Sequence, residues 1–151
     1  LAEAVCHRPR SYGGAELEVL WPCPGYDPGY DPNDNSIVLR LTYGERRFLF
    51  TGDIEELAEQ ALVDRGMDLE ADWLKVPHHG SRTSSTEAFL DAVRPRLAAV
   101  SCGRRNRFGH PHPEVAARYD AHGIPLFRTD TDGGLVFESD GQTIRARTTL
   151  P

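Results

Sequence analysis

Residues 73–81 read Trp-Leu-Lys-Val-Pro-His-His-Gly-Ser, so that a short apolar run ends in proline and two adjacent histidines. Imidazoles on a turn at the end of a buried strand can bind a metal ion or transfer a proton. Two other apolar runs end in a similar way, since residues 47–50 lead to Asp53 and residues 97–100 lead to His110. Three strand-like runs that each precede metal-competent side chains predict a chemical site.

The composition is that of an ordinary soluble domain, with 151 residues of which 39% are hydrophobic and 26% are charged. The net charge of −6 argues against a general nucleic-acid coat protein, which would be basic. A local basic segment is nevertheless formed by Arg94, Arg96, Arg104, Arg105 and Arg107. No apolar run approaches the roughly 20 residues that span a bilayer.

The cysteines exclude two classes of small protein. Three widely spaced cysteines without a Cys-x-x-Cys pair make neither a disulfide framework nor a zinc ribbon. At most one bridge can form, and Cys6 and Cys23 are a conceivable pair.

The remaining pattern alternates between strands and helices. Residues 1–15 are expected to be a lead-in or linker, and residues 21–35 a loop rich in proline, glycine and aspartate. Residues 130–133 are expected to form a turn. Strands are predicted at residues 16–20, 36–42, 47–50, 73–76, 97–100, 125–128, 135–138 and 143–146.

Three helices are expected between these strands. In the first, Glu55, Glu56 and Glu59 should face solvent near the positive end of the helix dipole. The helical spacing places one apolar stripe inward: Ile54, Leu57, Ala58, Ala61 and Leu62. The second helix should open with a capping box from Ser84 to Glu87. Its expected inward residues are Ala88, Phe89, Ala92 and Val93. The third should begin at Pro113, with Val115, Ala116 and Tyr119 on one side.

This order of elements predicts an α/β (α+β) fold in which helices flank a mixed sheet with some parallel pairing. In open sheets of this kind, ligands bind at the carboxyl ends of the strands. Asp53, His78, His79 and His110 all fall at such ends, and they are therefore the candidate catalytic and metal-binding residues.

Each candidate also has a structural interpretation. Asp53 precedes a helix and can be its N-cap instead of a ligand. His78 and His79 are adjacent and point in different directions, so one can bind metal while the other contacts substrate. Asn106 can hold its loop through backbone hydrogen bonds. Ser81 is interpreted as a turn residue, because no Gly-x-Ser-x-Gly elbow is present.

Several motifs together resemble a known family. They are Asn-Asp-Asn-Ser-Ile-Val-Leu at 33–39, Phe-Thr-Gly-Asp at 50–53, Leu-Lys-Val-Pro-His-His-Gly-Ser at 74–81, and Ser-Cys-Gly at 101–103 followed by Asn106 and Gly-His-Pro at 109–111. As an ordered set they resemble the C-terminal metallo-β-lactamase-like domain of ComEC-type competence proteins, which are inner-membrane channels for DNA uptake. The similarity runs from about residue 33 to 141.

The resemblance implies a metal-dependent hydrolase in an αββα sandwich with two divalent metal ions, zinc or manganese. Asp53 then matches the carboxylate that bridges the metals, and His110 matches the last metal-binding histidine. His78 and His79 match an active-site pair in which one acts as proton donor, with His79 as an alternative metal ligand. The expected substrate is a DNA phosphodiester. The expected substrate-binding residues are Ser81, Arg104, Arg105, Asn106 and Arg107.

One departure from the family is important. The first ligand motif, His-x-His-x-Asp-His, is absent, so residues 1–151 are expected to be a single partial domain, the C-terminal half of the sandwich. We therefore expect this chain alone to bind metal weakly and to be inactive. The expected partners are DNA, the missing N-terminal half and the membrane channel of the same polypeptide. The resemblance places the soluble domain on the extracytoplasmic face of the inner membrane.

Two alternatives remain open at this point. A catalytically idle DNA-binding or scaffold domain could retain the same fold. A hydrolase of the same fold could act on a thioester, a lactam or a phosphorylcholine ester.

Overall fold

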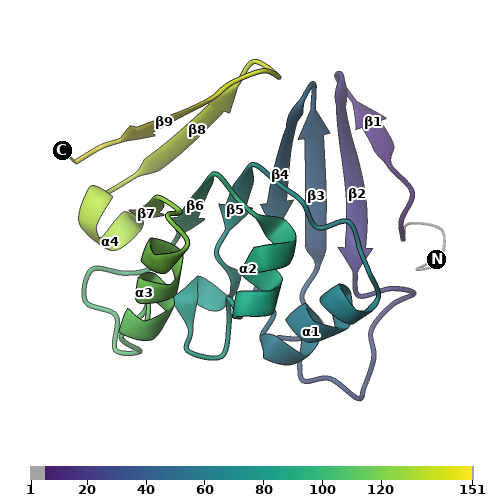
Figure 1. Ribbon diagram of the computed structural model, residues 1–151, viewed down its shortest axis with the longest axis horizontal. Helices are drawn as coiled ribbons and strands as arrows, with labels where there is room; N and C mark the ends of the chain where they lie inside the picture. The colour runs from purple at the N-terminus through teal and green to yellow at the C-terminus, as the bar shows by residue number, and fades with distance from the viewer. Residues whose placement is uncertain (1–5, 151) are drawn as a thin grey trace.

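The computed structural model describes residues 6–150, which form a seven-stranded mixed sheet and a separate two-stranded hairpin (Figure 1). The strands follow one another across the sheet in chain order. Neighbouring strands are antiparallel from β1 to β4 and parallel from β4 to β7. The sheet comprises β1 (Arg10–Tyr12), β2 (Ala15–Trp21), β3 (Val38–Tyr43), β4 (Arg46–Phe50), β5 (Trp73–Lys75), β6 (Leu97–Val100) and β7 (Leu126–Arg128). The predicted mixed sheet is confirmed.

Helices connect the parallel strands. The crossovers contain α1 (Glu56–Asp64), α2 (Glu87–Val93) and α3 (Pro113–Ala121). Because parallel crossovers are right-handed and all step in one direction across the sheet, they place their helices on one face. Figure 1 shows the three helices side by side in front of the sheet. Three shorter pieces follow or interrupt this order: the 3₁₀ turn η1 (Pro77–Gly80), the single-turn α4 (Thr129–Asp132) and the hairpin of β8 (Leu135–Ser139) and β9 (Ile144–Thr148).

Two local predictions near the termini were wrong. Residues 10–12 were expected to be part of a linker, but they pair with β2 as an edge strand. Residues 130–133 were expected to be a turn, but most of them belong to α4. Residues 1–5 of the expected lead-in lie outside the described residues.

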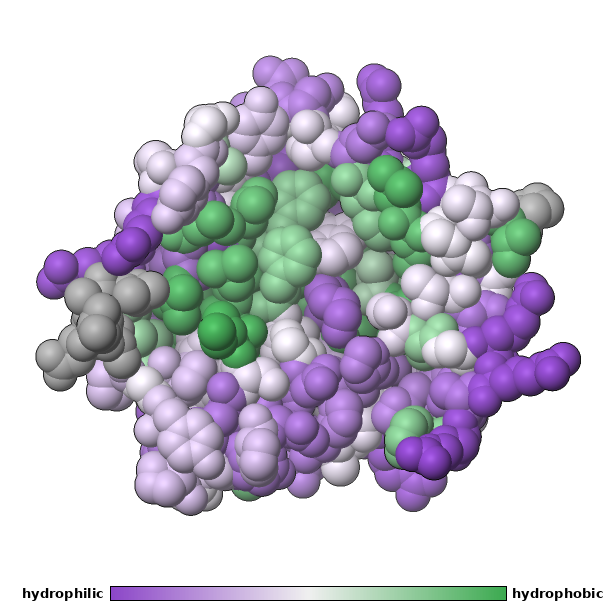
Figure 2. All heavy atoms as spheres, turned by 180° about the vertical axis from the view of Figure 1, so that it is seen from behind, coloured by the Kyte–Doolittle hydropathy of each residue, from purple (hydrophilic) through white to green (hydrophobic). Residues whose placement is uncertain are grey.

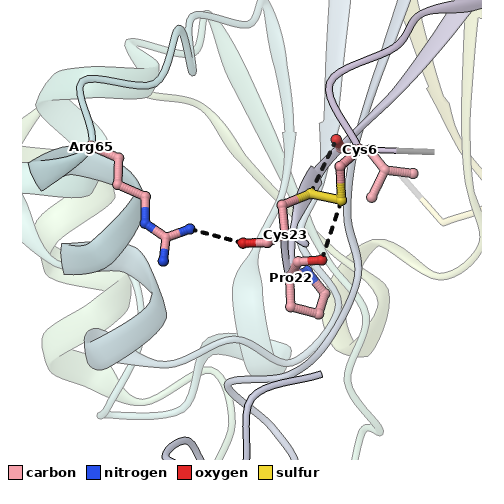
Figure 3. The surroundings of a disulfide bond; sticks show 5 residues. Cys6, Pro22, Cys23 and Arg65 are labelled. Atoms are coloured by element: carbon pink, nitrogen blue, oxygen red, sulfur yellow. Dashed lines mark hydrogen bonds between the residues drawn. A yellow bond between two sulfur atoms is a disulfide. The ribbon is translucent and has the colours of Figure 1, made fainter. Parts of the chain in front are cut away.

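A disulfide joins the N-terminal segment to the end of β2. Cys6 and Cys23 are bonded, so the conceivable pair is formed (Figure 3). The Arg65 guanidinium, at the end of α1, donates to the Cys23 carbonyl at 3.3 Å and lies 4.7 Å from the centroid of the Trp21 ring. These contacts fasten the segment before β1 to the helix-covered side of the molecule.

The main core lies between the sheet and the three helices, and it corrects the predicted orientation of α1. Ala58 and Leu62 are buried as expected, but Leu57 is 59% exposed and Glu59 is fully buried. The Glu59 carboxylate accepts the backbone N–H groups of Ser85 and Thr86 at 2.6 and 2.7 Å. The helix is thus rotated relative to the orientation that the hydrophobic pattern predicts, because the buried Glu59 carboxylate holds the neighbouring loop.

The helix caps also differ from the predictions. Glu55, not Asp53, precedes the first helical residue, and the buried Asp34 carboxylate accepts the N–H groups of Glu55 and Ala58 at 2.7 and 3.2 Å. Asp53 is therefore not the N-cap.

At α2 the cap is Thr86, whose hydroxyl accepts the Phe89 N–H, so the predicted capping box from Ser84 was wrong. On the same helix Leu90 is buried and Ala88 is exposed, which also shifts the predicted inward face.

The opposite face of the sheet is less covered. The hairpin of β8 and β9 packs there over Phe48, Trp73 and Ala99, which form a second, smaller core. Figure 2 shows apolar side chains gathered on this face. Because paired residues on adjacent strands share one face, the register places an additional set beside this core: Leu17, Val19, Leu39, Leu41 and Phe50. These side chains are partly or largely exposed, and we call them the back-face patch.

Candidate active site

The candidate residues meet at the carboxyl ends of β4, β5 and β6. Gly52 and Asp53 follow β4, while His78 and His79 lie within η1 after β5. The His78 N–H donates to the Gly52 carbonyl at 3.2 Å, and this hydrogen bond joins the segment after β4 to the segment after β5. His110 lies on the loop between β6 and α3. The predicted position of the site at this sheet edge therefore agrees with where these residues lie.

The two histidines adopt an unusual backbone conformation. His78 and His79 have φ angles of 42° and 54°, in the left-handed region that non-glycine residues enter at a cost. The Ser84 hydroxyl donates to the carbonyls of Pro77 and Ser81 at 3.0 and 2.9 Å, which holds both ends of the turn. Strain maintained by surrounding contacts is common at functional sites.

The loop that carries His110 packs closely against this turn. Gly80 has a φ of 78°, and a Cβ atom there would lie 2.6 Å from the Pro111 Cβ atom. The His112 N–H donates to the Gly80 carbonyl at 2.8 Å. Only glycine at position 80 therefore allows the loop that carries His110 to approach the paired histidines.

His79 and Asp53 form a pair whose geometry suits a shared metal ion. The His79 Nδ1 atom lies 2.7 Å from the Ser101 carbonyl oxygen, which can only accept, so Nδ1 carries the proton. The other ring nitrogen, Nε2, lies 3.4 Å from Asp53 Oδ1. Ligands that share a tetrahedral zinc ion at about 2.0–2.1 Å lie roughly 3.3 Å apart. A backbone acceptor on the other imidazole nitrogen is also typical of metal-binding histidine.

His78 is held by a different partner. Its Nδ1 atom lies 2.7 Å from Glu55 Oε1, and the same oxygen accepts the Thr83 hydroxyl at 2.8 Å. Glu55 was predicted to face solvent, but it orients His78 instead. An acidic residue two positions after Asp53 is indistinguishable in sequence from an ordinary first-turn glutamate, so no local signal identified this contact.

His110 completes a group of three imidazoles. Its ring centroid is 5.9 Å from that of His78, and the centroids of His78 and His79 are 6.4 Å apart. Burial lowers the pKa of His110, and the charge that the nearby His78, His79 and His112 rings can carry lowers that pKa further. A neutral imidazole is the form that binds metal.

Asn106 fastens the His110 loop. Its amide nitrogen donates to the carbonyls of Gly103 and His110 at 2.8 and 2.7 Å, and its amide oxygen accepts the His110 N–H at 2.8 Å. The expected loop-holding function is confirmed, whereas its expected contact with substrate stays a prediction.

The other predicted substrate contacts lie around the same edge. The Ser81 hydroxyl is 3.0 Å from that of Thr83. Arg104, Arg105 and Arg107 are exposed on the His110 loop, and Arg104 donates to the Asp130 carbonyl at 3.4 Å. Their function in substrate binding stays a prediction.

The basic segment seen in the sequence is divided in space. Arg94 and Arg96 precede β6, at the opposite end of that strand from the histidines. They form ion pairs with Glu70 at 3.3 Å and with Asp72 at 3.2 Å. These two arginines are therefore remote from the site, and the local positive charge comes from the His110 loop.

Lys75 is a further residue near the site that the sequence did not single out. Burial lowers the pKa of its ammonium group, while the Asp53 carboxylate opposes that decrease. The ammonium group donates to the Val76 carbonyl at 2.7 Å.

A second acidic group lies beside the site. Among residues 6–150, the metal-capable atoms of Asp31, Asp34 and Glu55 form the one group of three within 4.8 Å of each other. One oxygen of each of these carboxylates already accepts a backbone or side-chain proton. Asp53, His79 and His110 do not form such a group. Catalytic zinc normally has three protein ligands, so the Asp53–His79 pair fits part of a metal site.

Comparison with known proteins identifies the class of this fold and site. Residues 14–104 match the metallo-beta-lactamase superfamily, and the chain belongs to it. This superfamily is typically dependent on divalent metal ions. The match includes Asp53, His78 and His79 and ends before His110.

The chain is also similar to individual curated proteins. It is 39% identical to Competence protein ComA of Neisseria gonorrhoeae over 142 residues, which cover 86% of this chain and 20% of that protein. It is 37% identical to ComE operon protein 3 of Bacillus subtilis over 105 residues, or 70% of this chain and 14% of that protein. Recombination protein 2 of Haemophilus influenzae is 37% identical over 101 residues, or 67% and 13%. The resemblance to ComEC-type competence proteins is thereby confirmed, and the chain spans a fifth or less of these relatives.

Proposed function

We propose that this chain is part of a metal-dependent hydrolase that cleaves DNA phosphodiester bonds in a protein of natural competence. The observation that supports this proposal most directly is the Asp53–His79 pair, in which Nε2 lies 3.4 Å from a carboxylate oxygen. The relatives named as competence proteins support the biological setting. The exposed arginines of the His110 loop favour a phosphate-containing substrate.

The active-site residues divide into two functions in this proposal. Asp53 and His79 hold divalent metal, zinc or manganese, and His110 contributes from the adjacent loop. When bound, such ions polarise a phosphoryl oxygen and lower the pKa of a coordinated water. His78 transfers a proton to the leaving oxygen from Nε2 when both of its ring nitrogens are protonated, while Glu55 accepts the Nδ1–H and orients the ring.

The proposed site is completed by another part of the polypeptide. The Asp53–His79 pair provides fewer ligands than catalytic zinc requires, and the back-face patch leaves apolar side chains available for packing. We infer that the N-terminal half of the sandwich packs on this patch and supplies the remaining ligands. This chain alone then binds metal weakly and is inactive.

The proposed location rests on the family resemblance. We place the domain on the extracytoplasmic face of the cell membrane, attached to a channel portion of the same polypeptide. Within residues 6–150, no helix has both the length and the apolar character needed to cross a bilayer.

The test is degradation of an oligonucleotide by the complete domain with manganese. Asp53→Asn, His78→Ala and His79→Ala should each lower the rate by at least about 10²-fold. His122→Ala is a matched control, because this histidine lies at the end of α3 and pairs with Glu87 and Asp91 of α2. Wild-type rates in all three site variants would contradict the proposal.

A catalytically idle DNA-binding domain is the second candidate, favoured by the lack of a third ligand near Asp53 and His79 among the described residues. Salt-dependent DNA binding by the complete domain, without turnover at any metal concentration, would support it.

A further inference from the structure

Phe108 is an aromatic side chain that the proposed chemistry does not use. It lies on the His110 loop between Arg107 and Gly109, and it is 67% exposed. Its ring stacks at 27° to that of His110, with centroids 5.7 Å apart. A phenylalanine this exposed gains little from packing, but the stacking holds it in a defined orientation beside the candidate site.

A pocket of about 490 Å³ opens beside this ring. Its wall contains the rings of His79, Phe108 and His110, together with the chain at residues 101–103. One side of the pocket is therefore the candidate metal ligand His79, and another is an apolar aromatic face. A ligand in this pocket would lie directly against the proposed reaction centre.

The charge around the pocket indicates an anionic ligand. Arg104, Arg105 and Arg107 lie on the same loop and are exposed. No carboxylate of the described chain lies within 4.0 Å of their guanidinium groups. A loop that carries an exposed aromatic ring and three guanidinium groups without carboxylate partners is complementary to a ligand that alternates phosphates with flat rings.

We propose that this pocket binds an unpaired nucleobase of single-stranded DNA, with Phe108 as the stacking platform. The proposal rests on the proposed nuclease function and specifies its substrate. In a duplex, both faces of each base are covered by its neighbours, so an aromatic side chain can stack only on an unpaired or displaced base. The loop arginines hold the flanking phosphates while the stacked base sets the position of the strand.

Arg107 does not block this binding mode. Its guanidinium carbon lies 5.1 Å from the centroid of the Phe108 ring. An exposed cation–π contact of this kind is weaker than base–aromatic stacking. The base therefore replaces the guanidinium where the two compete, and Arg107 becomes available to a phosphate.

Tyr26 shows that exposure of an aromatic side chain does not by itself indicate a binding site. It is 69% exposed, similar to Phe108, but it lies on the loop after β2 and does not line the pocket. Scattered exposed aromatic residues are normal on protein surfaces. Tyr26 thus serves as a matched control.

The test is equilibrium binding of the protein, without metal and at fixed salt, to a fluorescent single strand of about 12 nucleotides and to the matching duplex. Phe108→Leu keeps apolar bulk but removes the aromatic face, so it should weaken single-strand binding about tenfold and leave duplex binding nearly unchanged. Phe108→Trp and Tyr26→Leu should bind the single strand at least as well as wild type. Wild-type affinity in Phe108→Leu, or an equal loss for both DNA forms, would overturn the proposal.

The same variants separate this inference from the proposed function. If the complete domain cleaves no DNA but Phe108→Leu weakens single-strand binding, the binding site stands and the nuclease function fails. If the domain cleaves DNA and Phe108→Leu leaves both binding and KM for the single strand unchanged, the nuclease stands and the stacking site fails.

Discussion

The carboxylates near the candidate site fall into two groups with opposite surroundings. The oxygens of Asp34 and Glu59 accept backbone N–H groups at helix starts and in a loop, and both side chains are buried. The Asp53 side chain is 42% exposed and faces only His79 Nε2 within ion-pair distance. Asp34 and Glu59, the first group, are therefore engaged in hydrogen bonds that hold the fold. Asp53, the second group, is available to a ligand.

This difference separates stability from function. A carboxylate that satisfies buried N–H groups is difficult to remove without unfolding, because each orphaned donor costs free energy. A partly exposed carboxylate that accepts no buried N–H group contributes little to folding and is available for metal. Substitutions in the first group should therefore change the free energy of unfolding, and those in the second should change chemistry.

Glu59→Ala should have the largest effect on stability. It leaves the N–H groups of Ser85 and Thr86 without their acceptors in a buried position, and about 3 kcal/mol of unfolding free energy should be lost. Urea denaturation followed by circular dichroism measures this. Leu57→Ala, at an exposed position of the same helix, should stay within about 0.5 kcal/mol of wild type.

Glu59 should also make stability depend on pH. Burial raises the pKa of this carboxyl above its ordinary value of 4.5, more than the backbone donors lower it. The part of the stability that is linked to protonation of this carboxyl is therefore complete below the unfolded-state pKa and is lost as the pH rises through the raised, folded-state pKa. Glu59→Gln cannot titrate and should remove this part of the pH dependence. An unchanged pH profile in that variant would contradict the assignment.

Cys102, in the pocket beside His79, should react slowly with alkylating agents. Burial raises the pKa of its thiol from 9.0 to about 11, and the nearby Asp130 carboxylate adds to the increase. Only the thiolate is nucleophilic, so a two-unit increase lowers the rate at neutral pH by about 100-fold relative to the unfolded chain. Mass spectrometry after iodoacetamide treatment measures the rate. Equal rates in the folded and urea-unfolded chain would show that Cys102 is not protected.

Asp34→Ala should lower the free energy of unfolding by about 2 kcal/mol, since it removes the acceptor for the Glu55 and Ala58 N–H groups at the start of α1. Asp34→Asn retains an acceptor oxygen and should lose less. Thermal denaturation of the three proteins tests this order, and an Asn variant as unstable as the Ala variant would contradict it.

Asp53→Asn should have the smallest effect on folding, within about 0.5 kcal/mol of wild type, because its carboxylate accepts no backbone N–H group in residues 6–150. The same urea titration measures this. A loss comparable to that of Asp34→Ala would show that Asp53 is a structural residue.

The sequence predicted the sheet because its strands are short apolar runs bounded by turn residues, as at residues 73–76 and 97–100. It also placed Asp53, His78, His79 and His110 at one sheet edge, because parallel strands align their carboxyl ends. It did not predict the rotation of α1, since a nine-residue helix with both Leu57 and Glu59 has no unique buried face. The Glu55–His78 contact and the cap from Asp34 join residues more than twenty positions apart, so no local pattern reveals them.

The most direct measurement is a calorimetric titration of the complete domain with manganese and with zinc, comparing Asp53→Asn with Asp31→Asn. Asp31 belongs to the acidic group in which one oxygen of each carboxylate accepts a hydrogen bond, and its Oδ1 atom accepts the Asp34 N–H at 2.9 Å. We expect Asp53→Asn to weaken metal binding by more than about tenfold and Asp31→Asn to leave it unchanged. Loss of binding in the Asp31 variant, with wild-type binding in the Asp53 variant, would contradict the account.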